Sequence, residues 1–332
     1  METRTFGRTE LQLGILGFGC GSVGGLMARG SPKDQERAVA RALEAGVNYF
    51  DTAVQYGEGQ SEINLGRALK SLKAAGAVIG TKVRLKPEDH RRIGVAVAES
   101  LEASLKRLGR EQVDIFHLHN PIAAEPSAEN LSELQVLDDV APALDRLRHQ
   151  GKAQFIGLTA IGDTNALKEA IDSRLFDSAQ VVYNMLNPSA ATALPPRYPA
   201  QDYGRLFEHT KSAGVGVIAI RVLAGGALTG SPERHPIASP APAPIGSGSS
   251  FESDLGRAKR LSALVEEGFA DSLAEAATRF ALSHAAVGTI LVGVASPEQF
   301  ETALAAAANG PLPQAALSRL AELRRAFVGE AR

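Results

Sequence analysis

With 332 residues, 44% of them hydrophobic, and a formal net charge of −2, the chain has the length and core-forming content of one α/β barrel, and no Lys/Arg-rich run favours nucleic-acid binding. The single cysteine, Cys20, excludes an intramolecular disulfide framework, and the polar start METRTFGRTE lacks the apolar core of a secretory signal peptide. Because the most apolar stretch, residues 213–230, is interrupted by Arg221 and several glycines, we expect a cytoplasmic protein that neither spans a membrane nor binds nucleic acid.

Short apolar runs alternate with longer amphipathic segments along the chain. The apolar runs have the length and the Val/Ile/Phe content of strands buried on both faces, and they cover residues 13–19, 47–52, 77–82, 113–119, 153–159, 178–184, 215–220 and 288–294. Helical periodicity marks the segments 34–45, 62–72, 93–108, 129–149, 162–174, 202–213, 255–267 and 271–284. Strict alternation predicts a parallel sheet, and eight units favour closure over two open sheets. We therefore expect an α/β fold, a (β/α)8 TIM barrel that forms a single domain over residues 1–332.

One segment differs in composition from the rest. Residues 231–253, after the seventh predicted strand, contain five prolines and many Gly and Ser, which is too little apolar content to pack. We expect a mobile loop here, and its place at the active-site face favours a lid over a domain linker. An insertion without a role is the alternative.

Three ionisable residues lie at the ends of consecutive predicted strands: Asp51, Lys82 and His119. The C-terminal strand ends of a (β/α)8 barrel form its active-site face, so we expect these side chains to meet at one mouth. Tyr56 follows in the loop after Asp51, within reach of the same mouth. His117 shares a strand face with His119 and is expected one layer below, in the core. Such a convergence of ionisable groups perturbs pKa values and favours a functional site.

The residue types in this cluster suit proton transfer to a carbonyl oxygen. A phenol has a pKa near ~10, and a buried ammonium beside it favours the phenolate, so Lys82 is expected to lower the pKa of Tyr56. Asp51 would keep Lys82 charged, and His119 would orient the substrate oxygen. An acidified phenol is a good proton donor to an oxygen that becomes an alkoxide. Since no side chain supplies hydride, the chemistry implies a nicotinamide cofactor and no metal.

Residues 19–24, Gly-Cys-Gly-Ser-Val-Gly, match the G-x-G-x-x-G pattern of a dinucleotide-binding Rossmann fold. In that fold the glycines open a helix directly, whereas here the helix follows only after residues 30–32, Gly-Ser-Pro. We interpret the glycines, Gly19 among them, as backbone that turns closely around a ligand.

Three stretches together resemble the aldo-keto reductases. DTAVQYGEGQSEINLGRAL (51–69) is similar to that family's D-T-A-x-x-Y-G signature, GTK (80–82) to the segment with its lysine, and DIFHLHNP (114–121) to the segment with its histidine. The likeness continues through 180–184 and 216–230 to 292–300. The resemblance implies a catalytic tetrad of Asp51, Tyr56, Lys82 and His119, in an enzyme that interconverts a carbonyl (aldehyde, ketone or aldose) and an alcohol or lactone.

The resemblance also implies NADP(H) or NAD(H) bound in an extended conformation at the barrel mouth. Thr159, Gln180 and Asn184 match positions that hold the nicotinamide amide, and the loop Gly293 to Gln299, with Ser296, matches the one that grips the adenosine phosphates.

The chain departs from the family pattern at three places. Thr159-Ala160 replaces S-N, which loses one amide contact. Ile220-Arg221-Val222-Leu223 replaces Y-S-P-L, so Ile220 takes the place of the ring that stacks on nicotinamide, and Arg221 lies beside it at the cofactor. Asn120 follows the tetrad histidine where many members have an aromatic residue, which suggests a polar pocket for a hydroxylated or sugar-like substrate.

The choice between the two cofactors rests on the loop after the last strand. It carries no Lys or Arg but has Glu298, with Glu301 following, and these charges disfavour a 2′-phosphate. We therefore expect NAD(H) to be used at least comparably to NADP(H), with residues 257–260 as the alternative phosphate site.

The residues are also compatible with two other functions. A lysine at a barrel strand end could form a Schiff base, although Asp51 should keep Lys82 charged. A cofactor-sensing regulatory subunit is the non-enzyme alternative. The physiological substrate, the direction of the reaction and the oligomeric state do not follow from the sequence.

Overall fold

The computed structural model describes residues 1–240 and 242–330, so Ala241 and residues 331–332, which the predicted loop and domain include, lie outside the described residues. Eight strands, all paired in parallel, close into a barrel in the order β10–β11–β12–β3–β4–β5–β6–β9. Their bounds are β3 Leu16–Gly19, β4 Tyr49–Asp51, β5 Val78–Val83, β6 Val113–Leu118, β9 Ala153–Ala160, β10 Ser178–Val182, β11 Gly216–Ile220 and β12 Val287–Gly293. The predicted (β/α)8 TIM barrel is confirmed.

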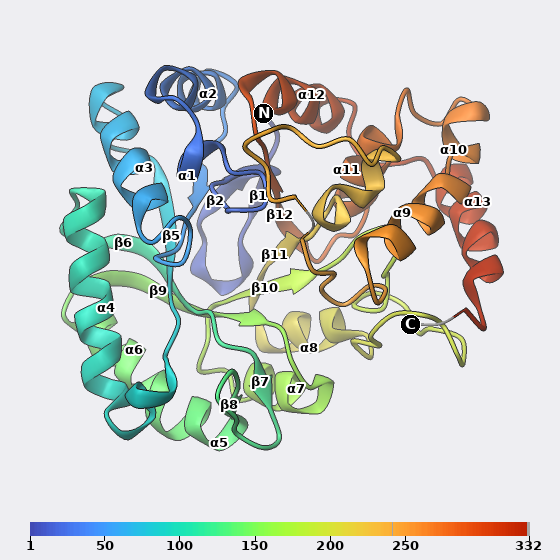
Figure 1. The fold of residues 1–332 in the computed structure, drawn as a ribbon. Coiled ribbons are helices and arrows are strands. Elements are labelled where there is room, and N and C mark those ends of the chain that lie inside the picture. Colours follow the sequence, from blue (N-terminus) through green and yellow to red (C-terminus); the bar gives the residue numbers. More distant parts are fainter. Residues whose placement is uncertain (241, 331–332) are drawn as a thin grey trace.

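Helices surround this ring of strands (Figure 1). The longer ones are α2 Pro32–Glu44, α3 Gln60–Ser71, α4 Ile93–Leu108, α6 Ala141–His149, α7 Thr164–Asp172, α8 Leu206–Ala213, α9 Phe251–Arg260, α11 Leu273–Leu282, α12 Pro297–Ala308 and α13 Gln314–Arg324. Shorter turns are α1 Leu26–Arg29, α5 Glu133–Gln135, α10 Ala263–Glu266, η1 Gly7–Thr9, η2 Pro87–Arg91, η3 Val136–Val140, η4 Ala224–Thr229 and η5 Arg325–Phe327. The helices follow from their periodicity: α4, for example, buries Val97, Leu101 and Leu108 on one face.

An N-terminal ribbon closes the lower end of the barrel. Strand β1 (Thr3–Thr5) pairs antiparallel with β2 (Gln12–Gly14), and Phe6 and Leu13 pack in a buried interior cluster with Tyr49, Ile115, Ile218 and Leu291. The expected single strand at 13–19 is therefore wrong. Its first part belongs to β2, and the chain bends at Ile15 so that β3 can join β12 and β4 in parallel. The apolar character is continuous because both pieces are buried.

Two other boundaries differ from the expected ones for local reasons. Within the predicted helix at 129–149, Leu131 and Ser132 form β8, which pairs with β7 (Ile122–Ala123), and Ser132 caps α5 by accepting the Gln135 amide. The predicted loop 231–253 ends at residue 250, because Ser250 caps α9. In the described part of the chain, no helix is long and apolar enough to cross a membrane.

The described part of the 231–250 segment contacts the first βα unit across the top of the barrel (Figure 1). The Ser239 amide donates to the Val23 carbonyl at 2.9 Å, and Arg29 Nε donates to the Ile237 carbonyl at 2.7 Å. The described part of the segment is therefore held by hydrogen bonds as well as by packing of Ile245 against the core. Whether the segment moves stays a prediction.

Candidate active site

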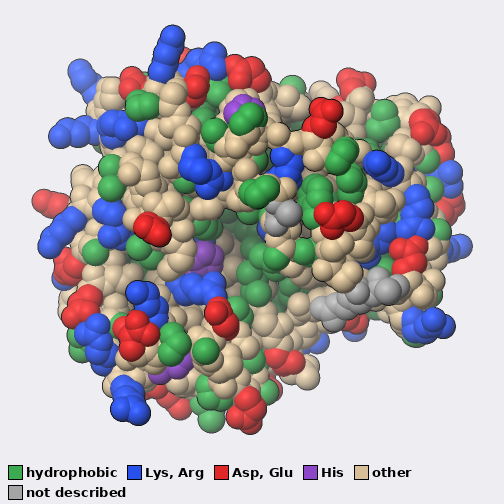
Figure 2. Space-filling view, in the orientation of Figure 1, with side chains coloured by type: hydrophobic (Ala, Val, Ile, Leu, Met, Phe, Trp, Pro, Cys, Tyr) green, Lys and Arg blue, Asp and Glu red, His purple; other side chains and the backbone are tan. Residues whose placement is uncertain are grey.

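A hollow of about 490 Å³ opens where the barrel strands end at their C-terminal side. Figure 2 shows this face of the molecule hollowed near its centre, with hydrophobic side chains inside and a histidine at the edge. Asp51, Tyr56 and His119 contribute to its wall, which also includes residues of β3, β9, β10, β11 and β12. A hollow of this size at this end of a barrel is the usual place for a substrate or cofactor.

Lys82 connects two of the predicted tetrad residues. Its Nζ donates to Asp51 Oδ2 at 2.5 Å, to the Thr52 carbonyl at 2.8 Å and to the Tyr56 hydroxyl at 3.3 Å. Lys82 has no solvent exposure, and only 4% of Asp51 is exposed. Neighbouring parallel strands β4 and β5 bring the two side chains together, as the sequence predicted.

The ionisation of this pair follows from burial and charge. Burial lowers the pKa of Lys82, but the Asp51 carboxylate and Tyr56 outweigh it, so the pKa of Lys82 is raised and the amine stays cationic. Burial raises the pKa of Tyr56 above its ordinary value, although Lys82 acts in the opposite direction. The expectation that Lys82 lowers the pKa of Tyr56 overall is therefore wrong, because desolvation of the phenolate and the Asp51 charge exceed the effect of the ammonium.

His119 lies against the edge of Tyr56, with ring centroids 5.9 Å apart. Burial, with help from the Lys82 and Arg84 charges, lowers the pKa of His119 to about 3, so the imidazole is neutral at ordinary pH. Its Nδ1 lies 3.0 Å from Gln55 Oε1, a partner that sequence reasoning missed. A neutral imidazole carries one proton, and the Gln55 amide influences which ring nitrogen holds it. An amide oxygen at Nδ1 keeps the proton on Nδ1, whereas an amide N–H there favours the proton on the other nitrogen.

His117 lies below the mouth, as expected for a core residue. It is fully buried, and its Nε2 is 3.0 Å from the Ser178 hydroxyl. Burial holds the pKa of His117 well below its ordinary value. It is therefore a neutral core residue rather than a second catalytic base.

The residues predicted to bind cofactor fall into two groups. Seven of them contribute to the wall of the hollow: Gly19, Thr159, Gln180, Ile220, Arg221, Gly293 and Gln299. The other two, Asn184 and Ser296, are absent from it. Asn184 is fully buried and bonds to the Arg221 carbonyl and to two backbone amides nearby, and Ser296 caps α12.

The predicted substrate residue Asn120 also lies away from the wall. It is 1% exposed, and its amide exchanges hydrogen bonds of 2.7 and 2.8 Å with the backbone N–H and carbonyl of Leu85. These bonds tie the end of β6 to the end of β5. The described hydrogen bonds of Asn120 go to the backbone, and its assignment to the substrate stays a prediction.

Unpaired polar atoms on the wall fit a bound nicotinamide cofactor. Among the described residues, the Thr159 hydroxyl and Arg221 Nε are buried without a hydrogen-bond partner. A carboxamide and a phosphate have the acceptors and donors that such groups need. Gly19 and Gly21 also contribute to this wall, and a Cβ on Gly19 would lie only 3.0 Å from the Val292 carbonyl of β12.

Two features of the wall were not predicted. Small side chains of α11 and α12 line one end of the hollow, and they suit a flat ring: Ala274, Thr278, Thr302, Ala303 and Ala306. Arg234 and His235, from the 231–250 segment, add basic groups to it. Small residues on a helix carry no ligand signal of their own, and the basic pair lies inside a segment that composition marks as a loop.

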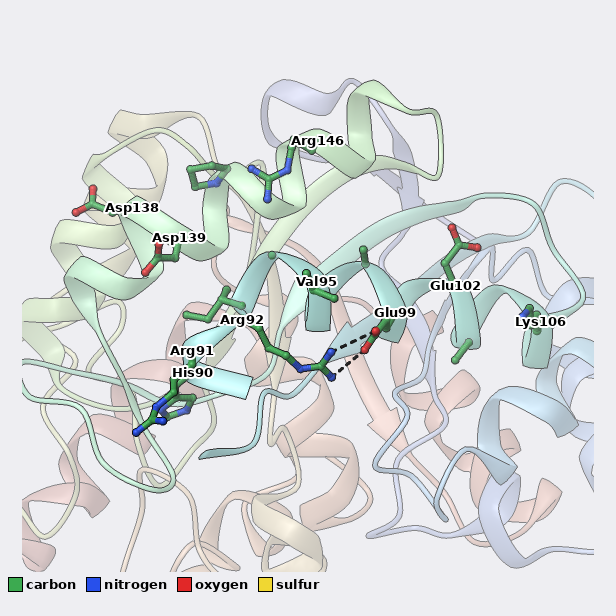
Figure 3. A pocket seen from close by; sticks show the side chains of 15 residues that line it. His90, Arg91, Arg92, Val95, Glu99, Glu102, Lys106, Asp138, Asp139 and Arg146 are labelled. Atoms are coloured by element: carbon green, nitrogen blue, oxygen red, sulfur yellow. Dashed lines mark hydrogen bonds and ion pairs between the residues drawn. The ribbon is translucent and has the colours of Figure 1, made fainter. Parts of the chain in front are cut away.

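A second hollow, of about 950 Å³, lies on the outer surface between α4 and the η3–α6 region (Figure 3). Its charged side chains are exposed, and Arg92 pairs there with Glu99 at 2.9 Å. It lacks the buried convergent ionisable groups of the barrel mouth. The mouth is therefore the candidate active site.

A closed (β/α)8 barrel with a buried Asp–Lys–Tyr chain beside a neutral histidine defines an oxidoreductase that acts on carbonyl or alcohol groups. A sequence model described as the Aldo/keto reductase family matches residues 15–325, and the chain belongs to that family. It catalyses NAD(P)-dependent interconversion of carbonyl and alcohol groups.

Similar proteins agree with this assignment. The chain is 29% identical over 314 residues to L-galactose dehydrogenase of Arabidopsis thaliana, covering 92% of this chain and 88% of that protein. It is 28% identical over 331 residues to pyridoxal 4-dehydrogenase of Microbacterium luteolum, covering 90% of each. A solved apo structure of an aldo-keto reductase from Bacillus halodurans has a TM-score of 0.69 at 25% identity, covering 97% of this chain and 96% of that one.

Proposed function

We propose that Tyr56 transfers the proton to and from the substrate oxygen, with Asp51, Lys82 and His119 as its supporting groups. The observation that carries this proposal is the buried Lys82 ammonium, which bridges Asp51 Oδ2 at 2.5 Å and the Tyr56 hydroxyl at 3.3 Å beside the hollow. Within the described residues, the hydrogen bonds of Lys82 Nζ go to Asp51, to the Thr52 carbonyl and to Tyr56, which supports a role for its charge at the phenol.

In carbonyl reduction, bound NAD(P)H supplies the hydride. The Tyr56 phenol remains protonated because burial raises its pKa, so it gives its proton to the substrate oxygen as negative charge develops there. The Lys82 cation stabilises the phenolate that remains, and Asp51 keeps Lys82 cationic. In alcohol oxidation the phenolate takes the proton back. His119, being neutral, positions the oxygen through one ring nitrogen.

For the cofactor, we propose that Thr159 and Gln180 face the carboxamide, that Ile220 packs on the ring, and that Arg221 faces the phosphates. The unpaired Thr159 hydroxyl and Arg221 Nε support this arrangement. The slot of small residues on α11 and α12 would take the adenine. We propose NAD(H) use at least comparable to NADP(H).

We propose a small hydroxylated carbonyl compound, such as an aldose, as substrate, and a cytoplasmic location. The names of two similar proteins, for L-galactose and for pyridoxal, support a hydroxyl-bearing substrate. The single cysteine, buried and unpaired, fits a reducing compartment. Aldehydes and ketones tested with NADPH and NADH, and aldoses tested with NADP+ and NAD+, would identify the class and the direction.

The decisive variant is Tyr56→Phe, which removes the hydroxyl and keeps the ring. Turnover should fall by about 10²–10⁴-fold, the usual contribution of general acid catalysis, while cofactor dissociation constants stay near wild-type values. Steady-state kinetics and cofactor titration measure the two quantities. Near wild-type turnover in this variant would exclude the assigned role.

The two alternatives have their own tests. A Schiff-base lyase needs a neutral lysine, yet the pKa of Lys82 is raised, so borohydride should trap no substrate on the protein. A regulatory subunit would bind the cofactor without turning over any member of the aldehyde panel.

A further inference from the structure

The carboxylate of Asp51 uses its two oxygens for different partners. Oδ2 accepts from Lys82 at 2.5 Å, whereas Oδ1 accepts from Gln180 Nε2 at 2.5 Å and from the Tyr49 hydroxyl at 3.1 Å. The Oδ1 donors come from β10 and from the position two residues earlier on β4 itself. Three donors thus fix the rotation of one carboxylate.

Tyr49 is a buried titratable group with no part in the mechanism given above. It has no solvent exposure and packs in the barrel interior. The strands on both sides carry glycines beside it: a Cβ on Gly80 would lie 2.4 Å from the Tyr49 hydroxyl, and a Cβ on Gly17 would lie 2.9 Å from its ring. These glycines leave the volume that the tyrosine fills.

The hydroxyl itself calls for an explanation beyond packing. Phenylalanine would fill nearly the same volume without burying a polar group, and a buried hydroxyl is tolerated when it has a hydrogen bond. The hydroxyl has one proton and donates it to Asp51 Oδ1, and the Gln180 side chain is its second polar neighbour. Burial, and then the Asp51 charge, raise the pKa of Tyr49 well above its ordinary value, so the group is a permanent donor.

We propose that Tyr49 is a positioning residue, which acts through Asp51 to hold Lys82 in place against Tyr56. The inference rests on the proposed function of Tyr56. A donor on Oδ1 draws negative charge away from Tyr56 and keeps Oδ2 directed at Lys82. Without it, the Asp51 charge acts more strongly on the phenol, which raises the pKa of Tyr56 further and makes it a weaker acid.

The test is Tyr49→Phe in the full-length enzyme with bound cofactor. We expect kcat for carbonyl reduction to fall about 3- to 10-fold, as for a rise of up to about one unit in the pKa of the acid. The alkaline limb of the pH profile should move upward, while KM and cofactor dissociation constants change less than about twofold. A merely structural role would not move the alkaline limb.

Tyr198→Phe is the matched control, because the Tyr198 hydroxyl also makes one buried hydrogen bond, of 2.9 Å, to the Leu186 carbonyl, and it is not part of the hollow's wall. Both variants should lose similar thermal stability, and only Tyr49→Phe should change kcat and the pH profile. A Tyr49→Phe enzyme with wild-type kcat and pH profile would overturn the proposal.

Gly80→Ala provides a second route if Tyr49→Phe does not fold. Its Cβ would displace the Tyr49 hydroxyl from Asp51, so it should reproduce the upward shift of the alkaline limb. An unshifted limb in Gly80→Ala would also contradict the proposal. Tyr56→Phe separates the two claims: if it is inactive while Tyr49→Phe behaves as wild type, the positioning role fails and the function of Tyr56 stands.

Discussion

A lysine ammonium without solvent contact needs an acceptor for each of its three protons, and Lys82 has Asp51, the Thr52 carbonyl and Tyr56. Asp51 in turn accepts from Lys82, Gln180 and Tyr49, so neither buried charge is left uncompensated. The one partner that changes protonation in the proposed reaction is Tyr56. In the proposed reaction the cluster is therefore an ion pair beside one proton-transferring group, Tyr56.

This charge pair predicts a specific pH profile. For carbonyl reduction at saturating cofactor, kcat/KM should be flat between about pH 5 and 8, the range in which an unperturbed histidine titrates. The reason is that the pKa of His119 is lowered to about 3 while that of Tyr56 is raised above its ordinary value. Activity should fall only on the alkaline side, where the phenol loses its proton. An acidic limb near pH 6.5 would show that His119 ionises during the reaction.

The same pH profile measured on Lys82→Met tests the coupling between Lys82 and Tyr56. Without the ammonium the phenolate is less stable, so turnover at neutral pH should fall strongly and the alkaline limb should move further upward. Retained activity at neutral pH would contradict the coupling between Lys82 and Tyr56. A suitable control is Lys152→Met, which removes a lysine from a surface pair with Glu102, outside the wall of the hollow.

The described part of the 231–250 segment lies over the mouth and is held partly by hydrogen bonds from side chains to backbone carbonyls. Arg234 Nη1 donates to the Gly225 carbonyl at 2.8 Å, and the Ser239 hydroxyl donates to the Ser22 carbonyl at 3.0 Å. Such contacts are weak compared with a packed apolar face, which makes the segment a candidate lid. Since Arg234 and His235 contribute to the wall of the hollow, a bound cofactor would add contacts to it.

We therefore expect saturating NADP+ or NAD+ to protect this segment. Limited proteolysis at Arg234 by trypsin should slow several-fold with cofactor, since closure lowers the population of the open form. Cleavage at sites outside the hollow should continue at an unchanged rate and serves as the control within the same digest. Equal rates at Arg234 with and without cofactor would identify a passive insertion.

The sequence predicts the strands and the residues at their ends better than it predicts the hydrogen-bond partners of those residues. The barrel strands were predictable because each is a short apolar run, and Asp51, Lys82 and His119 because each ends such a run. The partners Gln55 and Tyr49 were not, since nothing in the spacing shows that an amide will meet an imidazole or that a core tyrosine will bond two residues along its own strand.

The asparagines show a second limit of reasoning from sequence, because their untested ligand roles compete with structural ones. Asn184 was expected at the cofactor from its position in a motif, yet its amide bonds to backbone groups that hold the end of the strand in shape. A short amide at a strand end satisfies loop backbone as readily as it binds a ligand. Only the fold decides which of the two roles its position allows.

At the scale of the whole molecule, the first and last βα units meet beside the end of the hollow that we propose for the adenosine. Arg37 on α2 pairs with Glu298 at 2.5 Å, and Arg41 pairs with Glu301 at 2.7 Å. Sequence reasoning counted the two glutamates as free negative charges. In the structure each glutamate has an arginine partner, so the glutamates repel a 2′-phosphate less than the sequence suggested. The two arginines, in turn, are already paired with the glutamates and are less available to bind a phosphate.

The alternative phosphate site at 257–260 is weakened by the same fold. Arg257 is 2% exposed and pairs with Asp254 at 2.7 Å, while Arg260 pairs with Glu330. Neither residue contributes to the wall of the hollow. A 2′-phosphate would therefore need another basic partner, either Arg37 or Arg41 of α2 or the pair Arg234 and His235 on the wall of the hollow.

We accordingly predict that NAD(H) binds at least comparably to NADP(H). Measured dissociation constants decide the matter, and NADPH binding more than about 100-fold tighter than NADH, about 2.7 kcal/mol, would contradict it. Glu298→Gln should release Arg37 and strengthen NADPH binding by about 2- to 5-fold, in keeping with a surface pair of up to about 1 kcal/mol, and leave NADH binding unchanged. Glu322→Gln, which loosens a surface pair with Arg319 on α13, is the matched control and should alter neither constant. If Glu298→Gln changes the affinity for both cofactors equally, Arg37 does not distinguish the 2′-phosphate, and the preference is set elsewhere along the hollow.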